Sequence, residues 1–102
     1  MSPLAMNDMT HDEDAALTIP AGWKVVQGGR AIQRELRFKN FEEALRFVNK
    51  LGAEAEKANH HPDLTLGWGY VGITLTTHDS NKLTAKDIAL AEIANQLLTE
   101  FA

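Results

Sequence analysis

Two hydrophobic periods alternate along this chain, and their order restricts the fold more than any other property of the sequence. Short segments with apolar residues at every second position, as in β-strands, are joined by glycines. Two longer segments have apolar residues at helical spacing. In chain order, these segments predict two strands, a helix, two strands and a helix.

The first pair of strands is expected on either side of Gly28-Gly29. Residues 23–27 and 31–38 are rich in β-prone side chains, and glycines between two such runs are typical of a hairpin. The apolar side chains of residues 31–38 share one parity and the polar ones take the other. One face of the strand should therefore lie on the core and the other face in solvent.

The first helix is expected to begin after Asn40, because Asn40 with Glu43 three residues later is typical of a capping box. It should end near Asn59, since Pro62 cannot continue it. The apolar positions at helical spacing are Phe41, Ala44, Leu45, Val48, Leu51 and Ala55.

A second hairpin is expected around Gly69, between residues 64–68 and residues 71–75. Thr84 and Asp87 then repeat the capping-box spacing and open the last helix. Two amphipathic helices and a four-stranded antiparallel sheet can cover each other's apolar faces, so the fold class is a two-layer α+β domain. Trp23 and Trp68 are expected as core or interface anchors.

At 102 residues the chain is expected to form one domain. Residues 1–18 carry acidic and small side chains without a sustained apolar period. They should form a disordered arm that includes His11, and residues 19–102 should form the domain.

The composition argues against several classes of function. The apolar runs fall far short of the roughly 20 residues that a membrane helix needs, and the N-terminus does not resemble a signal peptide. A formal net charge of -4 offers no basic surface for nucleic acid. Without cysteine there is no disulfide and no thiol nucleophile, and a cytoplasmic protein is expected.

The histidines carry the clearest chemical signal. His60 and His61 stand directly before Pro62, and His78 follows the second predicted hairpin. Histidine has an unperturbed pKa of about 6.5, so a group of imidazoles suggests acid/base catalysis. Helical spacing predicts that Glu56 pairs with His60, and it brings Lys57 next to His61 in the same way.

Other interpretations of these histidines remain open on the residues alone. His60 and His61 could form a solvated helix end before a proline. A zinc site is disfavoured, because adjacent histidines rarely reach one ion and no H-x-x-x-H pair is present. A serine nucleophile is weaker still, since Ser80 lies in a predicted turn and no G-x-S-x-G sequence occurs.

The residues around the histidines form a pattern in three parts. Residues 56–62 read E-K-x-x-H-H-P, residues 71–78 end in T-T-H, and residues 83–87 read L-T-x-x-D. This order resembles the pterin-4a-carbinolamine dehydratases. The resemblance extends upstream through Gly22-Trp23 and residues 38–41.

The resemblance implies the α+β fold and the loss of water from 4a-hydroxytetrahydropterin, which gives quinonoid dihydropterin in tetrahydrobiopterin recycling. It implies that His60, His61 and His78 line the pterin pocket and act as acids and bases, with His61 as the leading base and with no metal or other cofactor. The further pocket residues that it implies are Glu56, Pro62, Thr77, Asp79, Ser80 and Asp87. Of these, Glu56 and Asp87 would orient the histidines.

The resemblance also implies partners. A homodimer or homotetramer is expected, and an aromatic amino-acid hydroxylase is a candidate pathway partner. Some relatives act in dimerisation or assembly, so a non-catalytic module on the same scaffold is the alternative function. A small metal-dependent hydrolase is a third option.

Two residues depart from the family pattern. Leu64 stands where many members carry an aromatic residue, and Lys82 stands where a glycine is usual. Because lysine does not favour the conformation of that glycine, we expect Asn81 to take the left-handed conformation in the turn after His78.

Overall fold

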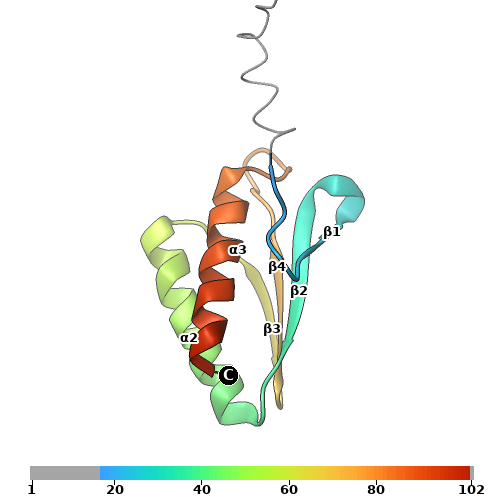
Figure 1. Ribbon diagram of the computed structural model, residues 1–102. Coiled ribbons are helices and arrows are strands. Elements are labelled where there is room, and N and C mark those ends of the chain that lie inside the picture. The colour runs from blue at the N-terminus through green and yellow to red at the C-terminus, as the bar shows by residue number, and fades with distance from the viewer. Residues whose placement is uncertain (1–16, 102) are drawn as a thin grey trace, which may run out of the picture.

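The order of the elements is the one that the sequence predicts (Figure 1). The computed structural model describes residues 17–101, so His11 and most of the predicted arm lie outside the described residues. In chain order the elements are β1 (Lys24–Val26), the 3-10 turn η1 (Gln27–Gly29), β2 (Ala31–Arg37), α2 (Phe41–Ala58), β3 (Asp63–Gly67), β4 (Tyr70–Leu75), α3 (Ala85–Leu98) and the 3-10 turn η2 (Thr99–Phe101).

The strands form one antiparallel sheet in the order β1-β2-β4-β3. In the central pair, Ile32 of β2 lies opposite Leu75 of β4, and Leu36 lies opposite Val71. All four side chains are buried, because residues of equal parity point to the same face of a sheet. The predicted alternation in β2 is confirmed.

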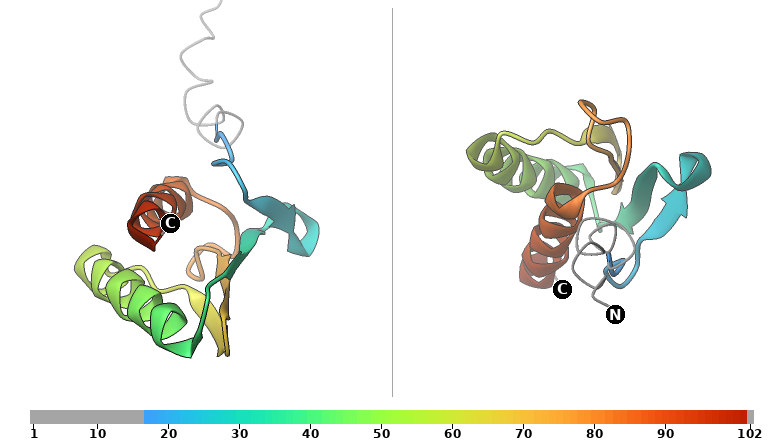
Figure 2. Two further views of the ribbon diagram at one scale, coloured as in Figure 1. Left: turned by 60° about the horizontal axis from the view of Figure 1, so that its bottom comes forward. Right: turned by 90° about the horizontal axis from the view of Figure 1, so that it is seen from above.

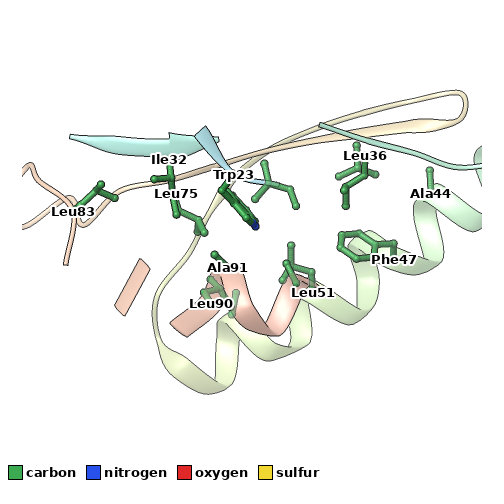
Figure 3. Packing of buried hydrophobic residues seen from close by; sticks show 14 residues of the cluster. Trp23, Ile32, Leu36, Ala44, Phe47, Leu51, Leu75, Leu83, Leu90 and Ala91 are labelled. Carbon is green, nitrogen blue, oxygen red and sulfur yellow. The ribbon is translucent and has the colours of Figure 1, made fainter. Parts of the chain in front are cut away.

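Both helices pack on one face of the sheet (Figure 2). Figure 3 shows Phe47 and Leu51 of α2 and Leu90 of α3 facing Ile32 and Leu36 of the sheet. Full burial of a side chain of this size stabilises a fold by about 1.5–3 kcal/mol. Among the described residues, no helix is long and apolar enough to cross a membrane.

The buried stripe of α2 is rotated from the predicted one. Its buried residues are Ala44, Phe47, Leu51 and Ala55. Phe41 and Leu45, which were predicted in the stripe, are 43% and 38% exposed. Leu45 follows Ala44 by about 100° around the helix axis, so the two residues cannot both face the sheet squarely.

The two tryptophans lie in different environments. Trp23 is 7% exposed and belongs to the core, as predicted, whereas Trp68 is 71% exposed. Trp68 follows the last residue of β3, in the turn before β4, where the alternation of the strand has ended. Its expected place in the core is wrong, and its role as an interface anchor stays a prediction.

Asn95 of α3 connects the segment before β1 to the rest of the fold. Its Oδ1 accepts hydrogen bonds from Trp23 Nε1 at 2.9 Å and from Arg34 Nη1 at 2.6 Å. Its Nδ2 donates to the carbonyl oxygen of Ala21 at 3.0 Å. One amide side chain thus holds three segments that are distant in sequence.

Replacing Asn95 with alanine should lower the free energy of unfolding by about 1–3 kcal/mol, because two part-buried donors, Trp23 and Arg34, lose their acceptor. Urea denaturation measures the change. Gln96→Ala, at an exposed position of the same helix, is the matched control and should change the value by no more than about 0.5 kcal/mol. Equal effects of the two substitutions would contradict the role of Asn95.

Candidate active site

The C-terminal end of α2 and the N-terminal end of α3 lie at the same end of the molecule, beside the loop that follows β4 (Figure 1). A cavity of about 260 Å³ lies there. Its lining residues are Asn59, His60, His61, Thr77, His78, Asp79 and Lys86. The three histidines singled out in the sequence are therefore brought together at one cavity.

The end of α2 determines where the first two histidines lie. Asn59 has a left-handed conformation, with φ 52° and ψ 43°. Its amide donates to Glu56 O at 3.1 Å, and the His60 amide donates to Ala55 O at 3.1 Å. This pair of bonds is a Schellman motif in which asparagine takes the usual place of glycine. The helix ends at the predicted position, and the chain turns away from the helical path before His60.

His60 is buried against Asp87. The imidazole is 8% exposed, and its Nε2 lies 2.6 Å from Asp87 Oδ1. Asp87 is fully buried, and a carboxylate in that position needs partners for both oxygens. Its Oδ2 accepts hydrogen bonds from the Thr77 hydroxyl at 2.8 Å and from the Thr84 amide at 3.0 Å. No buried side-chain nitrogen or oxygen within residues 17–101 lacks a partner.

Asp87 has two structural tasks. The predicted capping box of α3 is formed in full, with Thr84 Oγ1 accepting from the Lys86 amide and Asp87 accepting from the Thr84 amide. The same carboxylate contacts His60. Asp87 has no exposed surface, and it contacts both the ring of His60 and the hydroxyl of Thr77.

Glu56 contacts His61, and the predicted pair of Glu56 with His60 is wrong. His61 Nε2 lies 2.5 Å from Glu56 Oε2, and both side chains are more than half exposed. Helical spacing fails here because Asn59 leaves the helical conformation one residue before His60. Lys57 Nζ lies 3.4 Å from Glu54 Oε2 on the exposed side of the helix, and its expected place next to His61 stays a prediction.

His78 lies in the loop after β4, beyond the end of the strand. The strand ends at Leu75, and an isolated bridge pairs Thr77 with Lys82 across the following turn. Asn81 has φ 56°, which confirms the predicted left-handed conformation. The His78 side chain is exposed and has no hydrogen-bond partner within the described residues.

The other predicted pocket residues lie around this group. Asp79 lines the same cavity, and Ser80 lines a neighbouring cavity of about 390 Å³. Pro62 directly follows His61 in sequence and Glu56 contacts His61, but neither residue is among those that line the cavity.

Sequence reasoning missed two residues that line the cavity, Asn59 and Lys86. Asn59 could have been found, since an asparagine at a predicted helix end is a candidate for the left-handed conformation. Lys86 had no signal beyond its place in the segment that follows Thr84.

Two further observations concern the chemistry that this end of the molecule offers. Within residues 17–101, no three histidine, cysteine, aspartate or glutamate side chains are grouped so that they could hold a metal ion. A larger cavity of about 430 Å³ is lined by Phe38, Leu98 and Phe101 with charged neighbours, but by no histidine. The three histidines line the smaller cavity.

Known proteins have sequences that are similar to this one over most of its length. The sequence model of the family described as Pterin 4 alpha carbinolamine dehydratase matches residues 7–97. An Afipia carboxidovorans protein named "Putative pterin-4-alpha-carbinolamine dehydratase" is 40% identical over 98 residues, which cover 94% of this chain and 98% of that protein. A Cyanothece protein of the same name is 51% identical over 75 residues, covering 74% of this chain and 75% of that protein.

Two solved structures are also similar. The crystal structure of a transcriptional coactivator/pterin dehydratase from Brucella melitensis has a TM-score of 0.73 and 32% identity, covering 95% of this chain and 96% of that chain. A pterin dehydratase-like protein, described as a RuBisCO assembly factor in the alpha-carboxysome, has a TM-score of 0.65 and 22% identity, covering 74% and 88%, and shows the fold alone. By its sequence match, this chain belongs to the pterin-4-alpha-carbinolamine dehydratase family.

Proposed function

We propose that this protein removes water from 4a-hydroxytetrahydropterin to form quinonoid dihydropterin, by acid/base catalysis from histidines. The observation that carries the proposal is the meeting of three imidazoles at one cavity, two of them paired with carboxylates. Imidazoles exchange protons near neutral pH without a cofactor. Membership of the family supports the same class of substrate.

The reaction needs one base and one acid. As the base takes the proton of N5, the electrons of that nitrogen form a double bond to C4a, and the bond from C4a to its hydroxyl breaks. The acid protonates the departing oxygen, which leaves as water. Each such proton transfer typically contributes about 10²–10⁴-fold to a rate.

In this proposal His61 is the base. Its Nε2 is held by Glu56 at 2.5 Å, which leaves Nδ1 free to take a proton. His60 and His78 are the proton donors or stabilise the leaving group. The carboxylate of Asp87 beside His60 compensates the positive charge that an imidazole gains when it carries a second proton.

For substrate binding we propose the residues that flank the histidines in space. Asp79 and Thr77 line the histidine cavity, and Ser80 lines the adjoining one. Pro62 keeps the chain extended directly after His61. The substrate would come from an aromatic amino-acid hydroxylase, and the product would enter tetrahydrobiopterin recycling.

A dehydration assay with enzymatically generated 4a-hydroxytetrahydropterin tests the function. The purified protein should accelerate the loss of water over the spontaneous rate in proportion to its concentration, with and without a chelator. No acceleration, from a protein that is folded by circular dichroism, would refute the proposal. Turnover that disappears with the chelator and returns with zinc would refute the metal-free mechanism.

A second candidate function is an assembly module on the same scaffold. The two similar structures carry the descriptions transcriptional coactivator and RuBisCO assembly factor, which are statements about those proteins. In this chain the observation that favours a binding role is the 71% exposed Trp68 beside edge strand β3. A pure assembly module would not need three imidazoles at one cavity, so loss of turnover on histidine replacement distinguishes the two functions.

The protein should self-associate into a dimer or tetramer. Strands β1 and β3 are the edges of the sheet, and an open edge can pair with its copy around a two-fold axis. The C-terminal helix is another candidate contact through Leu97, Leu98 and Phe101, but these side chains already pack partly against the core. Light scattering during size exclusion at micromolar concentration measures the mass. A mass that stays near that of one 11.3 kDa chain at every dilution would contradict the prediction.

A further inference from the structure

Thr77 stands between the capping box of α3 and the His60–Asp87 pair. Its side chain is 8% exposed. The hydroxyl oxygen lies 2.8 Å from Asp87 Oδ2 and 2.7 Å from Thr84 Oγ1. A hydroxyl has one proton to donate and two lone pairs that can accept.

The directions of these hydrogen bonds follow from chemistry. An ionised carboxylate only accepts, so the Thr77 hydroxyl donates to Asp87 and must accept from the Thr84 hydroxyl. Thr84 Oγ1 itself accepts from the Lys86 amide at 3.2 Å. The Lys86 amide therefore donates to Thr84, and the hydrogen-bond chain continues from Thr84 through Thr77 to Asp87. Hydrogen bonds aligned in one direction polarise one another, so each strengthens the next.

The other carboxylate oxygen receives His60. Asp87 Oδ1 lies 2.6 Å from Nε2, so Nε2 carries the proton in this contact and Nδ1 is left for other chemistry. Nδ1 has no hydrogen-bond partner within residues 17–101. Every fully buried side-chain nitrogen or oxygen in these residues has a partner, so Nδ1 must be accessible to solvent. Since His60 lines the cavity, we infer that Nδ1 is accessible from there.

We propose that Thr77 is a positioning residue: through Asp87, its hydroxyl holds the Nε2–H of His60 against the carboxylate, so that neutral His60 is the Nε2–H tautomer and Nδ1, which faces the substrate, is the nitrogen that carries the second proton when His60 acts as a donor. The proposal rests on the proposed function for its kinetic consequence, but the tautomer is a property of the free protein. Because the Thr77 hydroxyl is already engaged on both sides, it has no proton left to donate to a bound pterin, and the contact that Thr77 offers a substrate in the cavity is its methyl group, which valine keeps. Loss of this hydroxyl should lower kcat about tenfold and leave KM within about twofold.

The variants Thr77→Val and Thr77→Ser separate the hydroxyl from the shape of the side chain. Valine keeps the shape without the hydroxyl, and serine restores the hydroxyl. Thr76→Val is the matched control, because Thr76 is 9% exposed and its hydroxyl donates to Arg30 O at 2.6 Å, outside the site. Its removal tests for general destabilisation by the same chemical change.

Two readouts are needed, kcat with KM and the nitrogen-15 NMR shifts of the His60 ring in the free protein. Natural protein, Thr77→Ser and Thr76→Val should show neutral His60 protonated at Nε2, whereas Thr77→Val should show a mixture of tautomers and the lower kcat. Neutral His60 protonated at Nδ1 in the natural protein, or unchanged shifts and kcat in folded Thr77→Val, would overturn the proposal. If Thr77→Val does not fold, a Thr77→Ser variant that loses the Nε2–H tautomer would overturn it. If no variant turns over pterin, the NMR result still decides the role of Thr77.

Discussion

His61→Ala should dehydrate 4a-hydroxytetrahydropterin at least about 10²-fold more slowly than the natural protein, because His61 is the proposed base. The fold should survive, since the side chain is 55% exposed and its pair with Glu56 is at the surface, where such pairs contribute about 0–1 kcal/mol. The measurement is kcat in the dehydration assay, with thermal denaturation as the check on folding.

The control for this substitution is His11→Ala. His11 is the remaining histidine of the sequence and belongs to none of the three parts of the histidine pattern. It should keep the natural rate, which would show that the loss depends on the position of the imidazole. Natural turnover in a folded His61→Ala variant would remove His61 from the mechanism.

A double variant extends this test. His78→Ala should also lose rate, and the variant with both substitutions should be less impaired than the product of the single effects, because groups that act as a unit are not additive. Strict multiplication of the two losses would mean that the imidazoles act independently.

Asp87→Ala should lower the free energy of unfolding by about 3–5 kcal/mol, the largest stability effect that we expect from one side chain of this site. The substitution removes the acceptor for three groups at once: the His60 ring, the Thr77 hydroxyl and the Thr84 amide. Since a small domain is stable by only about 5–15 kcal/mol, urea denaturation should show a large shift of the midpoint.

The matched control is Asp63→Ala, at an exposed position at the start of β3. Its effect should be within about 0.5 kcal/mol. A double-mutant cycle with His60→Ala measures the coupling between the two buried side chains, which we expect at about 1–3 kcal/mol. An Asp87→Ala variant as stable as Asp63→Ala would show that the buried hydrogen bonds contribute nothing.

The order of helices and strands could be predicted because its signals act over a few residues. The capping box at Thr84, the glycine turns and the stop before Pro62 each depend on neighbours within about one helical turn or one hairpin. The left-handed Asn81 belongs to the same class. The structure confirms these predictions. They could be made because contacts at this range follow from the spacing of residues in the sequence.

Partners at the site could be predicted less well. The sequence predicts His60, His61 and His78 as one group, but helical spacing pairs Glu56 with His60, whereas the structure pairs it with His61. One left-handed residue, Asn59, was enough to break the helical spacing on which that pair depended. The buried face of α2 differs from the predicted face for a related reason. Phe41 and Leu45 fit the helical spacing of apolar residues, but the contact with the sheet decides which side of the helix is buried.

The chain's own spacing thus accounts for its elements, their caps and the concentration of imidazoles near one helix end. Packing between distant segments accounts for the rest. His60 is buried because Asp87, 27 residues away, is brought against it by α3, and Trp23 finds Asn95 72 residues later. A buried polar group takes whichever partner the fold brings within about 3 Å, and that choice depends on how helices and sheet pack, which local spacing does not encode.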